Sequence, residues 1–225
     1  MRTSEDRLHT EPPQSEERLR ARDSLIERLG AESGVRDARI LEAFSRVPRH
    51  AFVRPSENDY AYTDVALPIG FKQTISQPSM IALMLDGLGI SAGERVLEVG
   101  GGSGYAAALM AELGAEVFTL EIVAELAQRA TRCLSDLGYD RVHVLHRDGR
   151  LGLPEHAPYD AIMVSAAAES VPDELLHELG AGGRIAIPVG GSAEQQLLVG
   201  RKSERGAVSW QRSVPCIFVP LVSGA

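Results

Sequence analysis

Apolar residues occur along the chain in two alternating patterns, helical stripes and short runs. The stripes, with apolar residues three or four positions apart, predict helices within residues 105–113 and 126–137 and after Pro172. The short runs, typical of strands buried on both faces of a parallel sheet, lie at 95–99, 116–120, 142–145, 160–164 and 184–189. This alternation predicts an α/β fold with a mostly parallel, doubly wound sheet.

The pattern changes near the C-terminal end. Residues 196–200, 208–211 and 214–219 have the composition of short strands separated by tight connections. Consecutive strands joined so closely pair antiparallel. We therefore expect an antiparallel C-terminal edge on the otherwise parallel sheet.

The N-terminal segment differs from the rest in composition. Residues 1–24 are polar and include Pro12-Pro13, so we expect a flexible tail that becomes helical towards its end. Residues 25–225 are expected to form a single domain, in which residues 25–90 make a cap of helices and loops. The cap contains helical stripes at 25–29, at 41–47 and after Pro78, and an ordered loop at 53–70.

A glycine cluster joins the strand at 95–99 to the helix that follows it. Glycines allow the backbone of Gly100–Gly104 to turn tightly beside a ligand. A dinucleotide frame would begin two residues late, at Gly102, and no lysine follows for a P-loop. Glu98 precedes the cluster in the form E-x-G-x-G-x-G, and Glu121 lies about 20 residues further on, where an acid commonly holds ribose hydroxyls. This pattern indicates a class I methyltransferase, with a purely structural glycine turn as the alternative.

Two other segments fall where an α/β sheet binds ligands. Asp148-Gly149 follows the strand at 142–145, although the dipeptide is also a common simple turn. Ser76 and Gln77 precede the helix that Pro78 opens, where free N–H groups and the helix dipole attract an anion. A capping role for Ser76 or Gln77 is the alternative.

Composition excludes several classes of function. The net charge is −8, from 23 Lys and Arg against 31 Asp and Glu, and the lack of a basic cluster disfavours nucleic-acid binding. No apolar run approaches 18 residues, and the first 30 residues lack a signal-peptide core, so we expect a cytoplasmic protein without a membrane partner. Cys133 and Cys216 are expected to be free thiols. With His143 and His146 they lack metal-ligand spacing, so no metal site is expected.

Taken together, these motifs resemble the protein-L-isoaspartate O-methyltransferase family, from about residue 25 to Leu221. The segments Thr-Ile-Ser-Gln-Pro at 74–78 and Val-Pro-Leu at 219–221 are more particular to that family than the glycine loop is. Two positions depart from it: Gly101 stands where members usually carry Thr or Ser, and Arg147 where glycine is usual. The other matching pieces are Val47-Pro48-Arg49, residues 66–70, Gln73, residues 96–105, Asp148-Gly149, residues 157–162, the alanines after Ser165, and residues 182–184, 187–190 and Phe218.

The resemblance implies a Rossmann-like class I methyltransferase fold with S-adenosyl-L-methionine as methyl donor and S-adenosyl-L-homocysteine as product. The acceptor it implies is the carboxylate of an isoaspartyl residue in a damaged peptide or unfolded protein. Ser76 matches the family's active-site serine. The implied donor-binding residues are Thr74, Ile75, Gln77, Glu98, Gly100, Gly101, Gly102, Ser103, Gly104, Glu121, Ile122, Asp148 and Gly149. The implied peptide groove comprises Asp64, Leu67, Ile69, Val219 and Pro220.

The chemistry fits a chain whose motifs contain no His-Asp pair. A free carboxyl group titrates near about 3.3–4.3, so the acceptor is already ionised at neutral pH and no strong base is needed. We expect Ser76 to position the carboxylate, in a monomeric repair enzyme. Two alternatives remain at this point. One is an enzyme of the same fold dedicated to a single modified peptide or small metabolite, and the other is a non-catalytic S-adenosylmethionine-binding homologue.

Overall fold

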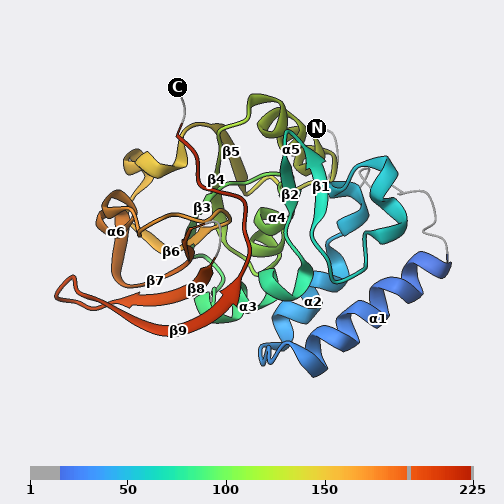
Figure 1. Cartoon of the computed structure of the whole chain (residues 1–225), viewed down its shortest axis with the longest axis horizontal. Helices are drawn as coiled ribbons and strands as arrows, with labels where there is room; N and C mark the ends of the chain where they lie inside the picture. The colour runs from blue at the N-terminus through green and yellow to red at the C-terminus, as the bar shows by residue number, and fades with distance from the viewer. Residues whose placement is uncertain (1–15, 192–193, 224–225) are drawn as a thin grey trace, which may run out of the picture.

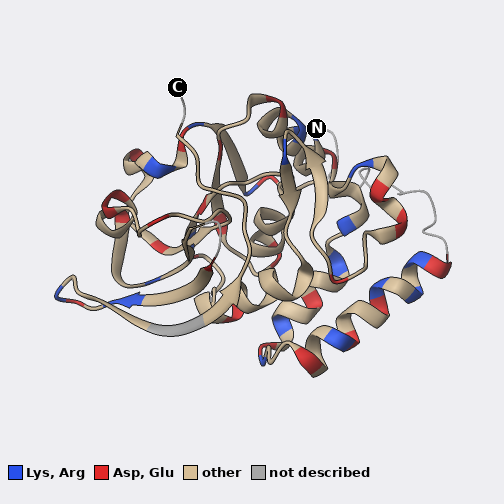
Figure 2. Cartoon of the chain, viewed as in Figure 1, with Lys and Arg blue, Asp and Glu red and all other residues tan. Residues whose placement is uncertain are grey.

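The structure is a computed structural model that describes residues 16–191 and 194–223, with the backbone alone at residues 211–213. Most of the expected tail, residues 1–15, lies outside the described residues. The first helix starts at Glu16 and continues through Gly30, so residues 16–24, at the end of the expected tail, are helical. Acidic and basic side chains alternate along this helix (Figure 2), and pairs such as Glu16 with Arg20 at spacing i,i+4 stabilise it.

A seven-stranded sheet forms the centre of the molecule (Figure 1). Its spatial order is β5-β4-β3-β6-β7-β8-β9; the β7–β8 and β8–β9 pairs are antiparallel, and the other neighbouring pairs are parallel. The strands are β3 (Arg95–Val99), β4 (Glu116–Glu121), β5 (Val142–His146), β6 (Tyr159–Val164), β7 (Leu179–Gly190), β8 (Gln195–Lys202) and β9 (Val208–Cys216). The predicted α/β class, the mostly parallel doubly wound sheet and its antiparallel C-terminal edge are confirmed.

Two apolar cores lie on the two faces of the sheet. The helices are α1 (Glu16–Glu32), α2 (Ala38–Arg46), α3 (Pro78–Leu88), α4 (Tyr105–Glu112), α5 (Ala124–Asp136) and α6 (Asp173–Glu178). Successive strand residues point to opposite faces of the sheet. Val96 therefore packs in the core on the face covered by helices α1 to α5, whereas Leu97 packs in the core on the face covered by helix α6. None of the helices in the described part of the chain has the length and apolar character needed to cross a membrane.

The direction of chain progression reverses between β3 and β6. From β3 the chain adds β4 and β5 on one side, and it then adds β6 and β7 on the other. Such a switch point opens a crevice at the carboxyl ends of the strands, where open α/β sheets bind ligands. The glycine loop after β3 and Ser165 after β6 both lie at this edge.

Two expectations about secondary structure were wrong. The segment 53–70, expected to be a loop, ends in strand β1 (Leu67–Gly70), which forms a two-stranded antiparallel sheet with β2 (Gln73–Ile75). The two short strands expected at 208–211 and 214–219 are one strand, β9. A register shift at Val199/Gly200 of β8 lets this strand pair along its whole length.

The turn between β1 and β2 has an unfavourable backbone. Phe71 has a φ of 54° and Lys72 a φ of 59°, a region that costs a non-glycine residue about 1–2 kcal/mol. Lys72 is exposed, so we expect Lys72→Gly to raise the free energy of unfolding by about 0.5–1 kcal/mol after the entropy of glycine is deducted. Urea unfolding measures this change. Lys72→Ala is the control because alanine keeps the Cβ atom, and equal effects of the two substitutions would contradict strain at this turn.

Candidate active site

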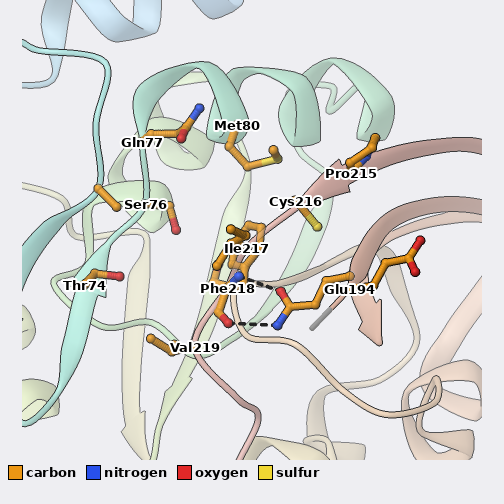
Figure 3. Close-up of a pocket in the computed structure, with 13 residues that line it drawn as sticks. Thr74, Ser76, Gln77, Met80, Glu194, Pro215, Cys216, Ile217, Phe218 and Val219 are labelled. Carbon is orange, nitrogen blue, oxygen red and sulfur yellow. Dashed lines mark hydrogen bonds between the residues drawn. The ribbon is translucent and has the colours of Figure 1, made fainter. Parts of the chain in front are cut away.

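Three adjoining cavities lie at the switch point, and Thr74 and Ser165 line all of them. The large cavity, about 460 Å³, lies between the β2–α3 segment and residues 215–219 (Figure 3). The loop cavity lies over the glycine loop and is also lined by Ser76. The edge cavity is lined by the glycine loop, the end of β4 and residues 219–222. A ligand in one cavity is therefore a direct neighbour of a ligand in the next.

The large cavity combines hydroxyl groups with apolar walls. Thr74, Ser76 and Ser165 bring the hydroxyls, and Met80 and residues 217–219 bring apolar surface. Among the described residues that line it, only Glu194 carries a charge. The cavity therefore offers hydrogen bonds to a polar group, without a cation to neutralise an anion.

Ser76 does not serve as the cap of α3, which was the alternative to an active-site role. Its hydroxyl has no hydrogen-bond partner among the described residues, and Gln77, at the N-cap position, makes no side-chain cap bond. The cap comes from Asp64, whose Oδ1 accepts the Ser79 N–H at 2.8 Å. Asp64 was expected in the peptide groove, but it lines none of the three cavities.

Left-handed backbone conformations shape the glycine loop. Gly100, Gly102 and Gly104 have φ values of 85°, 53° and 87°, which residues with a side chain rarely adopt. The departure at Gly101 has a steric reason, because a Cβ atom there would lie 2.2 Å from Oγ1 of Thr119. That hydroxyl donates to Glu98 at 2.6 Å. Thr119 thus occupies the space that a side chain at position 101 would need.

Glu98 is a buried acid between the glycine loop and β6. Its carboxyl group accepts hydrogen bonds from Thr119 and, at 3.3 Å, from the Ser165 hydroxyl. Burial raises its pKa to about 8, and the nearby Glu121 adds to the rise. Glu98 lines the loop cavity, so a cationic ligand group there would meet an acid able to ionise.

Glu98 should make the protein less stable as the pH rises. Its pKa is raised from 4.5 to about 8 on folding, so stability is highest below about pH 4.5 and falls as the pH rises to about 8, because the unfolded state ionises over this range while the folded state keeps its proton. Glu98→Gln has no such proton to lose. We expect the ligand-free variant to exceed the wild type by about 1–3 kcal/mol at pH 8, and by little at pH 5. Denaturant unfolding at both pH values tests this, and parallel pH profiles would contradict it.

Glu121 is held at the end of β4 by two backbone groups. Its Oε2 accepts the Gly102 N–H at 2.7 Å, and its Oε1 accepts the Val123 N–H at 2.8 Å. A carboxylate has about four lone-pair sites, so both oxygens keep acceptor capacity for the edge cavity that Glu121 lines. A fixed acid beside a glycine cradle fits the ribose of a nucleoside.

Of the two residues expected on the adenine side, one lines a cavity and the other does not. Gly149 lines the edge cavity, and a Cβ atom there would lie 2.5 Å from Cγ1 of Val99. Asp148 lines none of the three cavities, and its carboxylate accepts from the Arg150 backbone and guanidinium at 3.0 and 3.1 Å. Arg147, the second departure, pairs with Glu155 at an exposed position and does not line these cavities.

The structure brings most of the other predicted residues to the three cavities. Those that line at least one are Thr74, Ile75, Ser76, Gln77, Glu98, Gly100, Gly101, Gly102, Ser103, Glu121, Ile122, Gly149, Val219 and Pro220. Those that line none are Asp64, Leu67, Ile69, Gly104 and Asp148. Gly104 is needed for packing instead, because a Cβ atom there would lie 2.9 Å from Leu134.

Sequence reasoning did not assign three residues that shape the cavities. Ser165 follows the apolar strand β6 at the carboxyl edge, a position that could have identified it. Gln195 and Phe218 had no such signal. The buried Gln195 side chain donates to the Phe218 carbonyl at 3.1 Å and accepts the Phe218 N–H at 2.6 Å (Figure 3). This pair of bonds fixes the C-terminal segment as a wall of the large cavity.

Two further expectations concerned the cysteines and metal binding. Cys133 and Cys216 are free thiols, as expected. Within the described residues, no group of three or more His, Cys, Asp or Glu side chains could hold a metal ion.

Comparison with known proteins agrees with this site. Residues 20–225 match the family model of protein-L-isoaspartate(D-aspartate) O-methyltransferase. A protein-L-isoaspartate O-methyltransferase of Gloeobacter violaceus is 48% identical over 188 residues, which are 84% of this chain and 92% of that one. A solved structure of a protein-L-isoaspartate O-methyltransferase matches with a TM-score of 0.81 and 31% identity, covering 90% of this chain and 66% of that chain.

A second solved structure bears on the donor site. It is a putative protein-L-isoaspartate O-methyltransferase from Plasmodium falciparum in complex with S-adenosyl-L-homocysteine. Its TM-score is 0.76 at 25% identity, and the match covers 89% of this chain and 98% of that chain. On these matches, and on a fold with the expected sheet and glycine loop, the chain belongs to the protein-L-isoaspartate(D-aspartate) O-methyltransferase family.

Proposed function

We propose that this protein methylates the carboxylate of isoaspartyl residues in damaged peptides and unfolded proteins, with S-adenosyl-L-methionine as donor. One observation supports this most directly. A hydroxyl-lined cavity large enough for a peptide side chain adjoins two cavities with the acids and glycines of a nucleoside site, and Thr74 and Ser165 line all three. Donor and acceptor can thus meet at these two residues.

The donor side fits S-adenosyl-L-methionine by its residues. Glu121 would accept from the ribose hydroxyls, Gly100 and Gly102 would allow close approach of the backbone, and Glu98 would face the cationic end. When bound, the donor supplies an electrophilic methyl group. The edge cavity itself is about 50 Å³, so the donor would extend from it into the adjoining loop cavity, with which it shares Thr74, Gly100, Gly102 and Ser165.

The acceptor side fits an anion that must lose its charge during the reaction. A cation in the large cavity would stabilise the free carboxylate more than a transition state in which that charge is being lost. The hydroxyls of Thr74, Ser76 and Ser165 can orient the carboxylate without this penalty. We assign Ser76 the main positioning role because it matches the family's active-site serine and its hydroxyl, which has no partner among the described residues, lines the large cavity.

We propose a monomer, which sedimentation analysis can check. We also propose a cytoplasmic location, because the two free cysteines are usual for proteins of reducing compartments.

Labelled methyl transfer tests the proposed function. We expect the protein to transfer label from S-adenosyl-L-methionine to a synthetic isoaspartyl peptide as a base-labile ester. Calorimetry with S-adenosyl-L-homocysteine serves as the control for donor binding. Donor binding without transfer to any isoaspartyl peptide would contradict the proposal and favour a non-catalytic homologue. Transfer only to another carboxylate would favour a dedicated methyltransferase.

A further inference from the structure

Arg49 is a buried cation with no role in the chemistry described so far. It belongs to the Val47-Pro48-Arg49 motif and is 0% exposed, the largest of the fully buried side chains. No carboxylate among the described residues forms an ion pair with it. The Asp64 carboxylate attracts it through space without forming a salt bridge, and burial of a charge without a paired opposite charge is costly, so its other contacts must explain why the side chain is there.

The Arg49 guanidinium joins the two sides of the active site. Its Nη2 donates to the Ser76 carbonyl at 2.9 Å, and its Nε donates to the Ala61 carbonyl at 2.9 Å. Its central carbon lies 4.8 Å from the ring centroid of Tyr105, a cation–π contact. Tyr105 begins α4 directly after the glycine loop. One side chain therefore connects the Ser76 segment to the donor-binding loop.

The bond to the Ser76 carbonyl fixes the direction of one possible donor, the Gln77 N–H. The peptide between Ser76 and Gln77 is planar, so fixing its oxygen also fixes the Gln77 N–H on the opposite side. That N–H has no partner among the described residues, and both Ser76 and Gln77 line the large cavity. The orientation of this peptide determines where a carboxylate can be held.

Arg49 is poorly arranged for stability alone. Its Nη1 is buried and has no hydrogen-bond partner within the described part of the chain. An apolar side chain of similar size often matches or exceeds the stability that a buried charged group provides. The planar fork can, however, hold groups from separate segments in fixed directions, which a lysine ammonium cannot do.

We propose that Arg49 is a positioning residue for methyl transfer, which sets the Ser76–Gln77 peptide so that the acceptor carboxylate is correctly aligned. Arg49 contacts neither substrate, and it acts through the backbone of Ser76. The inference rests on the proposed function, and it adds a role for a residue outside the three cavities.

Arg49→Lys tests this role while keeping the positive charge. We expect kcat for an isoaspartyl peptide, per folded molecule, to fall about 10- to 100-fold, since a displacement of about 1 Å can cost 100-fold. The KM for the peptide should change less than kcat. The Kd for S-adenosyl-L-homocysteine should stay within about threefold, because the residues that line the edge cavity are unchanged.

Arg184→Lys is the matched control. The Arg184 guanidinium also joins separate segments, with bonds to the Leu88 carbonyl at 2.7 Å and the Asp160 carbonyl at 3.0 Å, but it lines none of the three cavities. Its loss should lower stability and leave kcat and KM per folded molecule unchanged. Circular dichroism and denaturant unfolding give the folded fraction of each variant.

A second variant covers the case in which Arg49→Lys does not fold. Arg49→Ala is assayed with ethylguanidinium, below concentrations that unfold the protein, and we expect a gain in kcat that Arg184→Ala and the wild type do not show. If Arg49→Lys folds, a kcat equal to that of the wild type would overturn the proposal. If Arg49→Lys does not fold, the absence of any gain in the kcat of Arg49→Ala with ethylguanidinium would overturn it. Failure of the wild type to methylate the peptide would instead remove the proposed function itself.

Discussion

Glu121→Gln should weaken donor binding by about 30- to 1,000-fold. The substitution removes the negative charge of the acceptor in two expected hydrogen bonds to ribose hydroxyls. Together this loss should cost about 2–4 kcal/mol of binding free energy. It also disturbs the loop, because each carboxylate oxygen accepts a backbone N–H, from Gly102 and from Val123, and an amide has one acceptor oxygen only. Titration calorimetry with S-adenosyl-L-homocysteine measures the change in Kd.

Glu116→Gln is the control for this experiment. Glu116 begins the same strand at the opposite edge of the sheet and pairs with Arg95 and His143 at 3.7 and 3.4 Å, in partly exposed positions. Exposed ion pairs contribute about 0–1 kcal/mol, so donor affinity should not change. Equal affinities of wild type and Glu121→Gln would show that Glu121 does not hold the ribose.

Ser76→Ala should separate donor binding from turnover. The hydroxyl lines the large cavity and has no partner among the described residues, so its removal leaves no buried group unpaired. We expect kcat on an isoaspartyl peptide to fall about 10- to 100-fold, equivalent to about 1.4–2.7 kcal/mol. The Kd for S-adenosyl-L-homocysteine should change by less than about threefold. Steady-state kinetics and calorimetry supply the two values.

Ser79→Ala provides the matched comparison for Ser76. Ser79 lies three residues further on in the first turn of α3, accepts a bond from the Gln77 amide at 2.8 Å, and lines none of the three cavities. Its turnover should match that of the wild type. Full turnover in Ser76→Ala would remove Ser76 from the role of carboxylate positioner.

The parallel core of the fold was predictable because its strands carry the signal themselves. Val96 to Val99 and Tyr159 to Val164 are almost continuous apolar runs, as buried parallel strands require. The β1–β2 hairpin was not predictable in the same way. Its turn has Phe71 and Lys72 at positive φ, where hairpin sequences normally carry Gly, Asn or Asp.

The site was predictable where local chemistry marks it and not where distant segments meet. The glycine loop, Glu98 and Glu121 stand at fixed places relative to two strands, and the structure brings them to adjoining cavities. Asp64 lines none of the three cavities, and its sequence context does not reveal that its carboxylate caps α3. The bonds between Gln195 and Phe218 join residues 23 positions apart, and no local pattern indicates them.

The comparison of two peptides tests the central claim most directly. An isoaspartyl peptide and its aspartyl twin have the same composition and differ only in which carboxyl group forms the backbone. We predict base-labile methyl transfer to the isoaspartyl peptide and none above background to the twin. Equal transfer to both, or transfer to neither by protein that binds S-adenosyl-L-homocysteine, would contradict the account.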